Sequence, residues 1–154
     1  MIEVRGDLWK YPADIRVITT NGSVNRSGNA VMGRGCALEA ATTWPQMPGV
    51  LGRQLKANGN HVYVIGLPDP VETFWLLTFP VKDTWSERAR TELIIRSCKE
   101  LLDTVARLEA EAEDFLEVVM PRPGCGFGGL RWGAVKVILD HYLDDRFRVI
   151  TWDR

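Results

Sequence analysis

The chain has 154 residues, of which 45% are hydrophobic and 25% are charged, and its formal net charge at neutral pH is −1. This length and composition predict one globular domain, spanning residues 1–154, with a substantial core. The small net charge argues against a protein that coats nucleic acid by neutralising phosphates, but it is compatible with an enzyme that engages a single nucleotide.

Strand-like and helix-like segments alternate through the first half of the chain. In chain order, we expect a strand over residues 2–5, a strand over 14–20, a helix over 36–41, a helix over about 50–57, a strand over 61–66 and a strand over 73–79. Pro45 and Pro48 are expected to break the chain before the second helix. Pro68 and Pro70 are expected to separate the last two of these strands.

The second half of the chain continues the alternation. Thr84 and Glu87 have the spacing of a capping box, which predicts that a long helix follows them directly. Its apolar residues recur at helical spacing from Leu93 to Leu108, so one face should be buried. A strand over residues 115–120, a helix over 131–143 and a strand over 148–152 complete the pattern. Such alternation predicts an α/β sandwich with a largely parallel central sheet, whose ligand lies beyond the carboxyl ends of the strands.

The cysteines and the apolar runs bear on the compartment. Cys36, Cys98 and Cys125 are odd in number and lack metal-ligand spacing with each other or with the two histidines. No apolar run approaches the roughly 20 residues of a membrane-spanning helix, and the N-terminus lacks the pattern of a signal peptide. We therefore expect a reduced, cytoplasmic protein that has no membrane partner and no structural zinc site. No other metal and no cofactor are expected.

Two glycine-rich segments each connect an expected strand to an expected helix. The first glycine loop (residues 27–36) contains Gly28, Gly33 and Gly35, and the second glycine loop (residues 121–130) has four glycines within six positions. Glycine lets backbone N–H groups approach an anion closely, and a helix N-terminus adds partial positive charge. Each loop alone is equally compatible with a tight turn. Two of them together indicate a clamp on a ligand with more than one phosphate.

Taken together, these segments resemble the macrodomain family, whose members bind ADP-ribose. The resemblance covers nearly the whole chain: an opening Gly6-Asp7-Leu8, an asparagine-containing first loop and a Gly-Cys-Gly second loop. It implies a macrodomain-like three-layer α/β/α sandwich with a mixed, mostly parallel central sheet. The expected ligand is ADP-ribose or an ADP-ribosylated substrate.

One stretch is similar to a particular branch of that family. Residues 79–85, Phe-Pro-Val-Lys-Asp-Thr-Trp, resemble the Phe-Pro-Thr-Lys-x-x-Trp stretch of antitoxin macrodomains that strip ADP-ribose from thymidine in DNA. The lysine is required there, so the resemblance implies a catalytic role for Lys82. Relatives that act on protein carboxylates have an acidic residue where this chain has Gly128. Single-stranded DNA and a cognate ADP-ribosyltransferase are therefore the candidate partners.

The resemblance also implies an ADP-ribose site made by both glycine loops and by the residues that follow the first strand. The expected ligand-binding residues are Asp7, Leu8, Asn29, Met32, Gly33, Arg34, Gly35, Cys36, Pro123, Gly124, Cys125, Gly126, Phe127 and Gly128. Asp7 would accept a hydrogen bond from the adenine amino group, and its alternative role is to cap a turn. Asn21 is favoured over Asn25 and Asn29 to orient the distal ribose, although turn asparagines commonly bond only to their own backbone.

Lys82 and Asn21 are the expected catalytic residues. Release of ADP-ribose breaks the anomeric C–N or C–O bond through an oxocarbenium-like transition state. An ammonium at Lys82 would protonate or hydrogen-bond the leaving group, whereas a neutral amine would attack the opened sugar and form a Schiff base. The sequence leaves both routes open. Cys125 has no histidine nearby in the sequence, which favours small-residue packing over a nucleophilic role.

Two other functions are compatible with the sequence. The missing acidic residue at Gly128 suggests a non-catalytic module that binds ADP-ribose or a related signalling nucleotide. Some family members are phosphatases that act on ADP-ribose-1''-phosphate, which would release phosphate without glycosidic cleavage. The leading hypothesis is an ADP-ribosyl glycohydrolase that acts on a nucleic-acid base such as thymidine.

Overall fold

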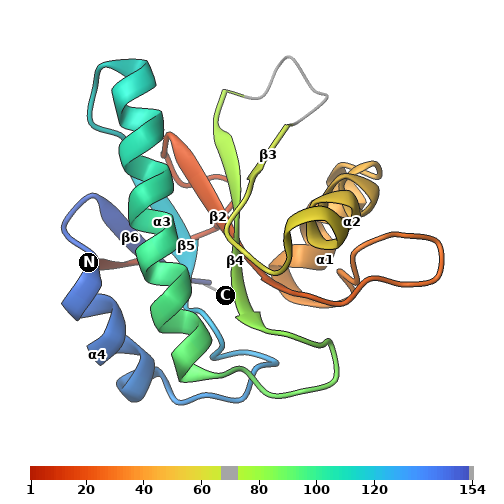
Figure 1. Ribbon diagram of the computed structural model, residues 1–154. Coiled ribbons are helices and arrows are strands. Elements are labelled where there is room, and N and C mark those ends of the chain that lie inside the picture. Colours follow the sequence, from red (N-terminus) through yellow and green to blue (C-terminus); the bar gives the residue numbers. More distant parts are fainter. Residues whose placement is uncertain (67–72, 153–154) are drawn as a thin grey trace.

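A mixed sheet forms the centre of the molecule in the computed structural model, which describes residues 1–66 and 73–152 (Figure 1). Within those residues the strands are β1 (Ile2–Arg5), β2 (Ile15–Asn21), β3 (Val64–Ile65), β4 (Trp75–Lys82), β5 (Val118–Pro121) and β6 (Phe147–Thr151). Their order across the sheet is β1-β6-β5-β2-β4-β3. All neighbouring strands are parallel except β3, which runs antiparallel to β4. The predicted mixed, mostly parallel sheet is confirmed.

Helices cover both faces of this sheet. They are α1 (Gly35–Thr43), α2 (Met47–Asn58), α3 (Thr91–Ala112) and α4 (Trp132–Tyr142). Figure 1 shows α3 and α4 on one side of the sheet and α1 and α2 on the other. Side chains alternate along each strand, so Val17 of β2 packs in the core with α3 and α4 while Ile18 packs in the core with α1 and α2. This arrangement confirms the three-layer α/β/α sandwich.

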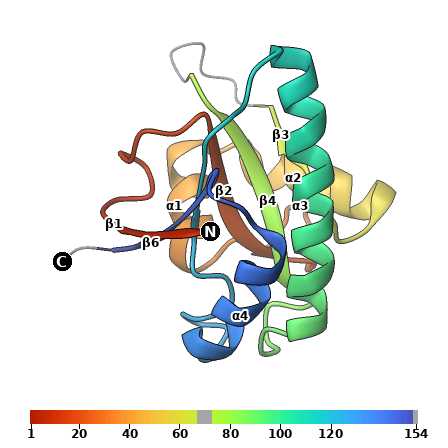
Figure 2. The same ribbon diagram turned by 90° about the vertical axis from the view of Figure 1, so that its left-hand side faces the viewer.

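The long helix α3 forms where an apolar stripe repeats at helical spacing, and it lies alongside β4 (Figure 2). Its buried side chains run from Leu93 to Leu108, as predicted. Its predicted start was wrong, because the helix begins at Thr91 and not directly after Thr84. The Glu87 carboxylate accepts a 2.9 Å hydrogen bond from the N–H of Thr84, so the capping contact forms but closes a separate turn ahead of the helix.

Two expected element boundaries also differ, and both involve proline. Pro48 lies in the first turn of α2, where its missing N–H costs nothing, so the helix begins earlier than predicted, at Met47. Pro80 lies inside β4 instead of following it. The N–H of Thr78 points toward β3 and donates a hydrogen bond to the carbonyl of Tyr63. The nitrogen of Pro80 points to the same side, but it lies beyond the end of β3. The ladder therefore loses no hydrogen bond at Pro80, and β4 continues to Lys82.

Two further strands also differ from the prediction in their bounds. The expected strand over residues 61–66 is reduced to Val64–Ile65, and the expected strand over 115–120 is shifted to Val118–Pro121. The turn expected at Pro68 and Pro70 lies outside the described residues. Within the described part of the chain, none of the helices combines the length and apolar character needed to cross a membrane.

Candidate functional site

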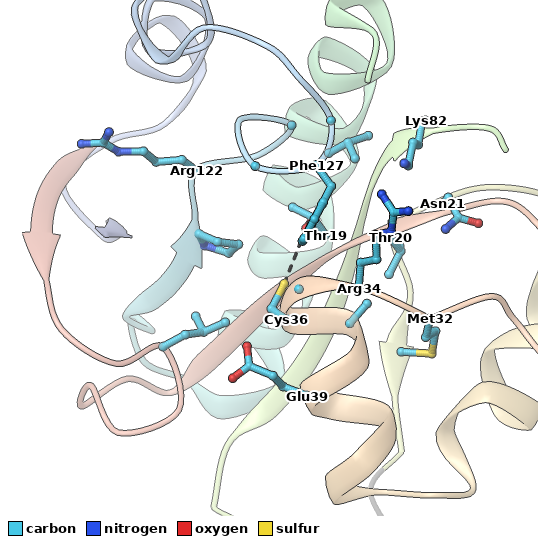
Figure 3. A pocket seen from close by; sticks show the side chains of 18 of the residues that line it. Thr19, Thr20, Asn21, Met32, Arg34, Cys36, Glu39, Lys82, Arg122 and Phe127 are labelled. Carbon is cyan, nitrogen blue, oxygen red and sulfur yellow. Dashed lines mark hydrogen bonds between the residues drawn. The ribbon is translucent and has the colours of Figure 1, made fainter. Parts of the chain in front are cut away.

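A cavity of about 630 Å³ opens at the carboxyl ends of the parallel strands (Figure 3). Its lining includes the last residues of three neighbouring strands, namely Asn21 of β2, Lys82 of β4 and Pro121 of β5. Strands that are parallel present these ends at one edge of the sheet, where α/β proteins commonly bind ligands. A volume of this size is typical of small-molecule and cofactor pockets.

Both glycine loops line this cavity. The first contributes the stretch from Val31 to Gly35 and the second contributes Gly124, Gly126, Phe127 and Gly128. The guanidinium carbon of Arg34 lies 5.1 Å from the centroid of the Phe127 ring, so the two loops are joined by a cation–π contact. Figure 3 shows these two side chains facing each other near Lys82. The loops thus form two walls of one site.

Backbone conformation and close packing account for two of the glycines of the second loop, Gly124 and Gly128. Gly124 has a φ of +74°, a conformation that L side chains rarely adopt. A Cβ added at Gly128 would lie 2.6 Å from the carbonyl oxygen of Gly124 and 2.8 Å from the Cβ of Ala89. No side chain fits at Gly128 in this conformation, so the absence of an acidic residue at that position has a physical cause. At Gly126, by contrast, an added Cβ would meet nothing within 4 Å.

Asn21 and Lys82 are neighbours in the register of β2 and β4. The Asn21 side chain donates a 3.0 Å hydrogen bond to the carbonyl of Val31 and accepts one of 2.9 Å from the N–H of Ser23. The Lys82 ammonium donates a 3.0 Å hydrogen bond to the carbonyl of Trp85. Backbone groups thus hold both side chains at the same end of the cavity, and the remaining N–H groups of Lys82 are available to a ligand.

A second interaction positions the backbone of Lys82. The Asn60 side chain donates hydrogen bonds to the carbonyl of Lys82 (3.0 Å) and to the carboxylate of Asp83 (3.1 Å). The carbonyl of Asp83 accepts a 3.0 Å bond from the N–H of Gly22. The end of β4 is therefore tied both to the segment before β3 and to the loop after β2.

Several expected ligand-binding residues lie outside the cavity lining. The Asp7 carboxylate accepts a 2.8 Å hydrogen bond from the N–H of Trp9, which is the turn-capping alternative considered above. The Asn25 side chain accepts 3.0 Å bonds from the N–H groups of Ser27 and Asn29, and neither asparagine lines the cavity.

Pro123 and Cys125 also lie outside the lining, whereas the remaining expected residues border the cavity: Leu8, Asn21, Met32, Gly33, Arg34, Gly35, Cys36, Lys82, Gly124, Gly126, Phe127 and Gly128. Asn21 is thus the only one of the three rival asparagines at the cavity.

The cysteines have the properties of packed thiols. Burial raises the pKa of the Cys36 thiol, whose Sγ lies 3.5 Å from the hydroxyl of Thr19. Burial also raises the pKa of Cys125, whose Sγ lies 3.5 Å from the carbonyl of Pro123, and it raises the pKa of Cys98 to about 12. A nucleophilic cysteine needs a lowered pKa. Among the described residues, no cluster of metal-ligating side chains is found either.

Sequence reasoning did not assign several residues that line the cavity. They are Gly6, Thr19, Thr20, Val31, Ala37, Glu39, Val81, Trp85, Pro121, Arg122, Ile150 and Trp152. The strand-end positions among them follow from the sheet register, which no local pattern reveals. Arg122 lies inside the second glycine loop and Trp85 inside the 79–85 stretch, so both had a sequence signal that was not used.

Several solved structures resemble this chain over nearly its whole length. The macrodomain of Thermus aquaticus DarG superposes on this chain with a TM-score of 0.74 at 25% sequence identity, covering 99% of this chain and 97% of that one. This chain has the macrodomain fold. The macrodomain of Mycobacterium tuberculosis DarG matches with a TM-score of 0.71 at 23% identity, over 99% of this chain and 97% of that one. The predicted macrodomain resemblance is confirmed.

Two further comparisons concern longer proteins. Thermosipho africanus DarTG, solved in complex with ADP-ribose, matches with a TM-score of 0.73 at 19% identity, over 99% of this chain and 42% of that chain. A DNA ADP-ribosyl glycohydrolase of Thermus aquaticus is 26% identical over 152 residues, which are 97% of this chain. This chain spans 39% of the length of that protein. No family model matches the chain.

Proposed function

We propose that this macrodomain binds ADP-ribose in the cavity and removes it from a modified nucleobase, with thymidine as the expected example. The observation that carries the proposal is the placement of Asn21 and Lys82 at adjacent strand ends, beside the two glycine loops. The likeness to a DNA ADP-ribosyl glycohydrolase and to DarG macrodomains supports it.

In this proposal the glycine loops bind the diphosphate. Backbone N–H groups of Gly33–Gly35 and Gly124–Gly128 would face the phosphate oxygens from two sides, and the N-terminus of α1 would add partial positive charge. The guanidinium of Arg34 belongs to the same wall and would neutralise charge there. The diphosphate thereby fixes the orientation of the whole ligand along the cavity.

The distal ribose would then lie against Asn21 and Lys82. The C–N bond between the anomeric carbon and the base breaks, and its electron pair leaves with the base. Lys82 donates a proton to the departing base, or hydrogen-bonds a base that leaves as an anion and takes its proton from solvent. A water molecule adds to the anomeric carbon and gives its proton to the neutral Lys82 amine in the first case and to solvent in the second, which yields ADP-ribose. Asn21 orients the ribose hydroxyls through its amide. Both side chains in this step are already held in place by backbone contacts.

The tight packing at Gly128 supports a base over a protein carboxylate as the leaving group. Relatives of the carboxylate type are expected to have an acidic side chain at this position, and the second glycine loop has no room for one. Single-stranded DNA is the proposed carrier of the base, in the cytoplasm, and a cognate ADP-ribosyltransferase is the proposed source of the modification.

The test is a time course of ADP-ribose release from a thymidine-ADP-ribosylated oligonucleotide. The native protein and Lys10→Ala, an exposed lysine outside the cavity, should release ADP-ribose, whereas Lys82→Ala should not. Calorimetry should show that Lys82→Ala still binds ADP-ribose. Full activity of Lys82→Ala would refute the proposed role of the lysine.

Three other outcomes would redirect the assignment. ADP-ribose binding without release by the native protein would indicate the non-catalytic binding module. Phosphate release from ADP-ribose-1''-phosphate without glycosidic cleavage would indicate the phosphatase. A covalent adduct on Lys82, trapped with cyanoborohydride during turnover, would replace the proton-donor role with the Schiff-base route.

A further inference from the structure

Trp85 is an exposed aromatic residue at the rim of the cavity. The residue is part of the cavity lining, yet it is 59% exposed, the highest value among the six tryptophans of the chain. Among the described residues it has no aromatic partner, whereas the exposed ring of Phe127 is already in contact with the Arg34 guanidinium. Tryptophan is normally well buried, because its large apolar surface is costly to leave in water. The uncovered indole is therefore available to a ligand.

The backbone of Trp85 is fixed on both sides. Its N–H donates a 3.0 Å hydrogen bond to the hydroxyl of Ser23, which belongs to the segment after β2. Its carbonyl accepts the 3.0 Å hydrogen bond from the Lys82 ammonium. Asp83, in the same turn, forms an ion pair with Arg90. These contacts set the position of the Trp85 backbone, and so the point from which the indole projects, relative to Lys82.

The location of Trp85 determines which part of a substrate it would meet. In the proposed function, on which this inference rests, the distal ribose lies against Asn21 and Lys82. The group bonded to its anomeric carbon would then lie beside the Lys82 ammonium, close to the residue whose carbonyl accepts a hydrogen bond from that ammonium. Trp85 is that residue.

We infer that Trp85 forms a subsite for a planar nucleobase leaving group. The base stacks on the indole while the Lys82 ammonium reaches a heteroatom at its edge. Base–aromatic stacking is worth about 1–3 kcal/mol per base, and it depends on a π-face that a glutamate or aspartate side chain lacks. Trp85 would thus favour base-linked over carboxylate-linked ADP-ribose, without contacting the ADP-ribose itself.

The experiment compares Trp85→Ala, Trp85→Phe and the control Phe115→Ala, which removes another exposed aromatic residue outside the cavity. Trp85→Ala should lower kcat/KM on the thymidine-ADP-ribosylated oligonucleotide by about five- to 150-fold. The Kd for free ADP-ribose should change less than twofold. Trp85→Phe should recover most of the activity, and Phe115→Ala should match the native protein.

Two results would overturn the inference: unchanged kcat/KM in Trp85→Ala, or an equal weakening of free ADP-ribose binding. If the native protein releases no ADP-ribose from the oligonucleotide, ligand affinities test the subsite instead. The native protein should then bind ADP-ribosyl-thymidine more tightly than ADP-ribose, and Trp85→Ala should lose that difference. Equal affinities in the native protein would refute the subsite, separately from any failure of the hydrolytic proposal.

Discussion

Replacing Gly128 with alanine should destabilise the second glycine loop, because the added methyl group has no space. The ideal Cβ would lie 2.6 Å from the carbonyl oxygen of Gly124, 2.9 Å from its Cα and 2.8 Å from the Cβ of Ala89, whereas ordinary contact begins at 3.4 Å. Two of these neighbours are backbone atoms. The loop must therefore shift by several tenths of an ångström, which would disturb the 2.9 Å hydrogen bond from the N–H of Leu130 to the Gly124 carbonyl.

Overpacking of this kind costs about 1–3 kcal/mol. For a protein of 154 residues each kcal/mol lowers Tm by about 2–4 °C, so Gly128→Ala should melt measurably earlier in calorimetry. Its Kd for ADP-ribose should rise by about tenfold or more, because displaced N–H groups lose charge-assisted hydrogen bonds.

The matched control is Gly126→Ala in the same loop. A Cβ there would meet nothing within 4 Å, and its φ lies outside the left-handed region, so its Tm should match that of the native protein within about 1 °C. If the Tm of Gly128→Ala equalled that of the native protein, or if Gly128→Ala and Gly126→Ala lowered Tm equally, the packing argument for the glycine at position 128 would be refuted.

Three further predictions concern contacts around the site. Arg34→Ala and Phe127→Ala should each weaken ADP-ribose binding. A double-mutant cycle on the free energy of unfolding of the ligand-free protein should give a coupling of about 0.5–1 kcal/mol between the two residues. Strictly additive losses of stability would contradict the cation–π contact. Ser97→Ala should lower the free energy of unfolding by about 1–3 kcal/mol in urea titrations, because the fully buried hydroxyl donates a 2.7 Å bond to the carbonyl of Pro80. Hydrogen bonds from Lys136 and Trp132 lower the pKa of Glu3 from 4.5, so its stabilising effect is present above pH 4.5 and is lost as the pH falls through the lowered pKa. The Tm advantage of the native protein over Glu3→Gln should therefore shrink below pH 4.5, and a pH-independent difference would refute this assignment.

Local patterns predicted most of the elements but not all of their ends. The apolar stripe from Leu93 to Leu108 identified α3, because its period fixes which face is buried. The spacing of Thr84 and Glu87 placed its start wrongly. A capping contact satisfies backbone N–H groups in an isolated turn just as it does at a helix, and the sequence does not distinguish the two.

The sequence by itself determined that two glycine loops follow buried strands, and it singled out Lys82 and Asn21 as candidates for the proposed reaction, since both inferences rest on residue type and on neighbours in the chain. Only the tertiary structure decided that Asn21, and not Asn25 or Asn29, lies beside Lys82. That outcome depends on the pairing of β2 with β4 and on a strand that continues through Pro80. Register between strands is set by packing across the whole sheet, which no local segment encodes.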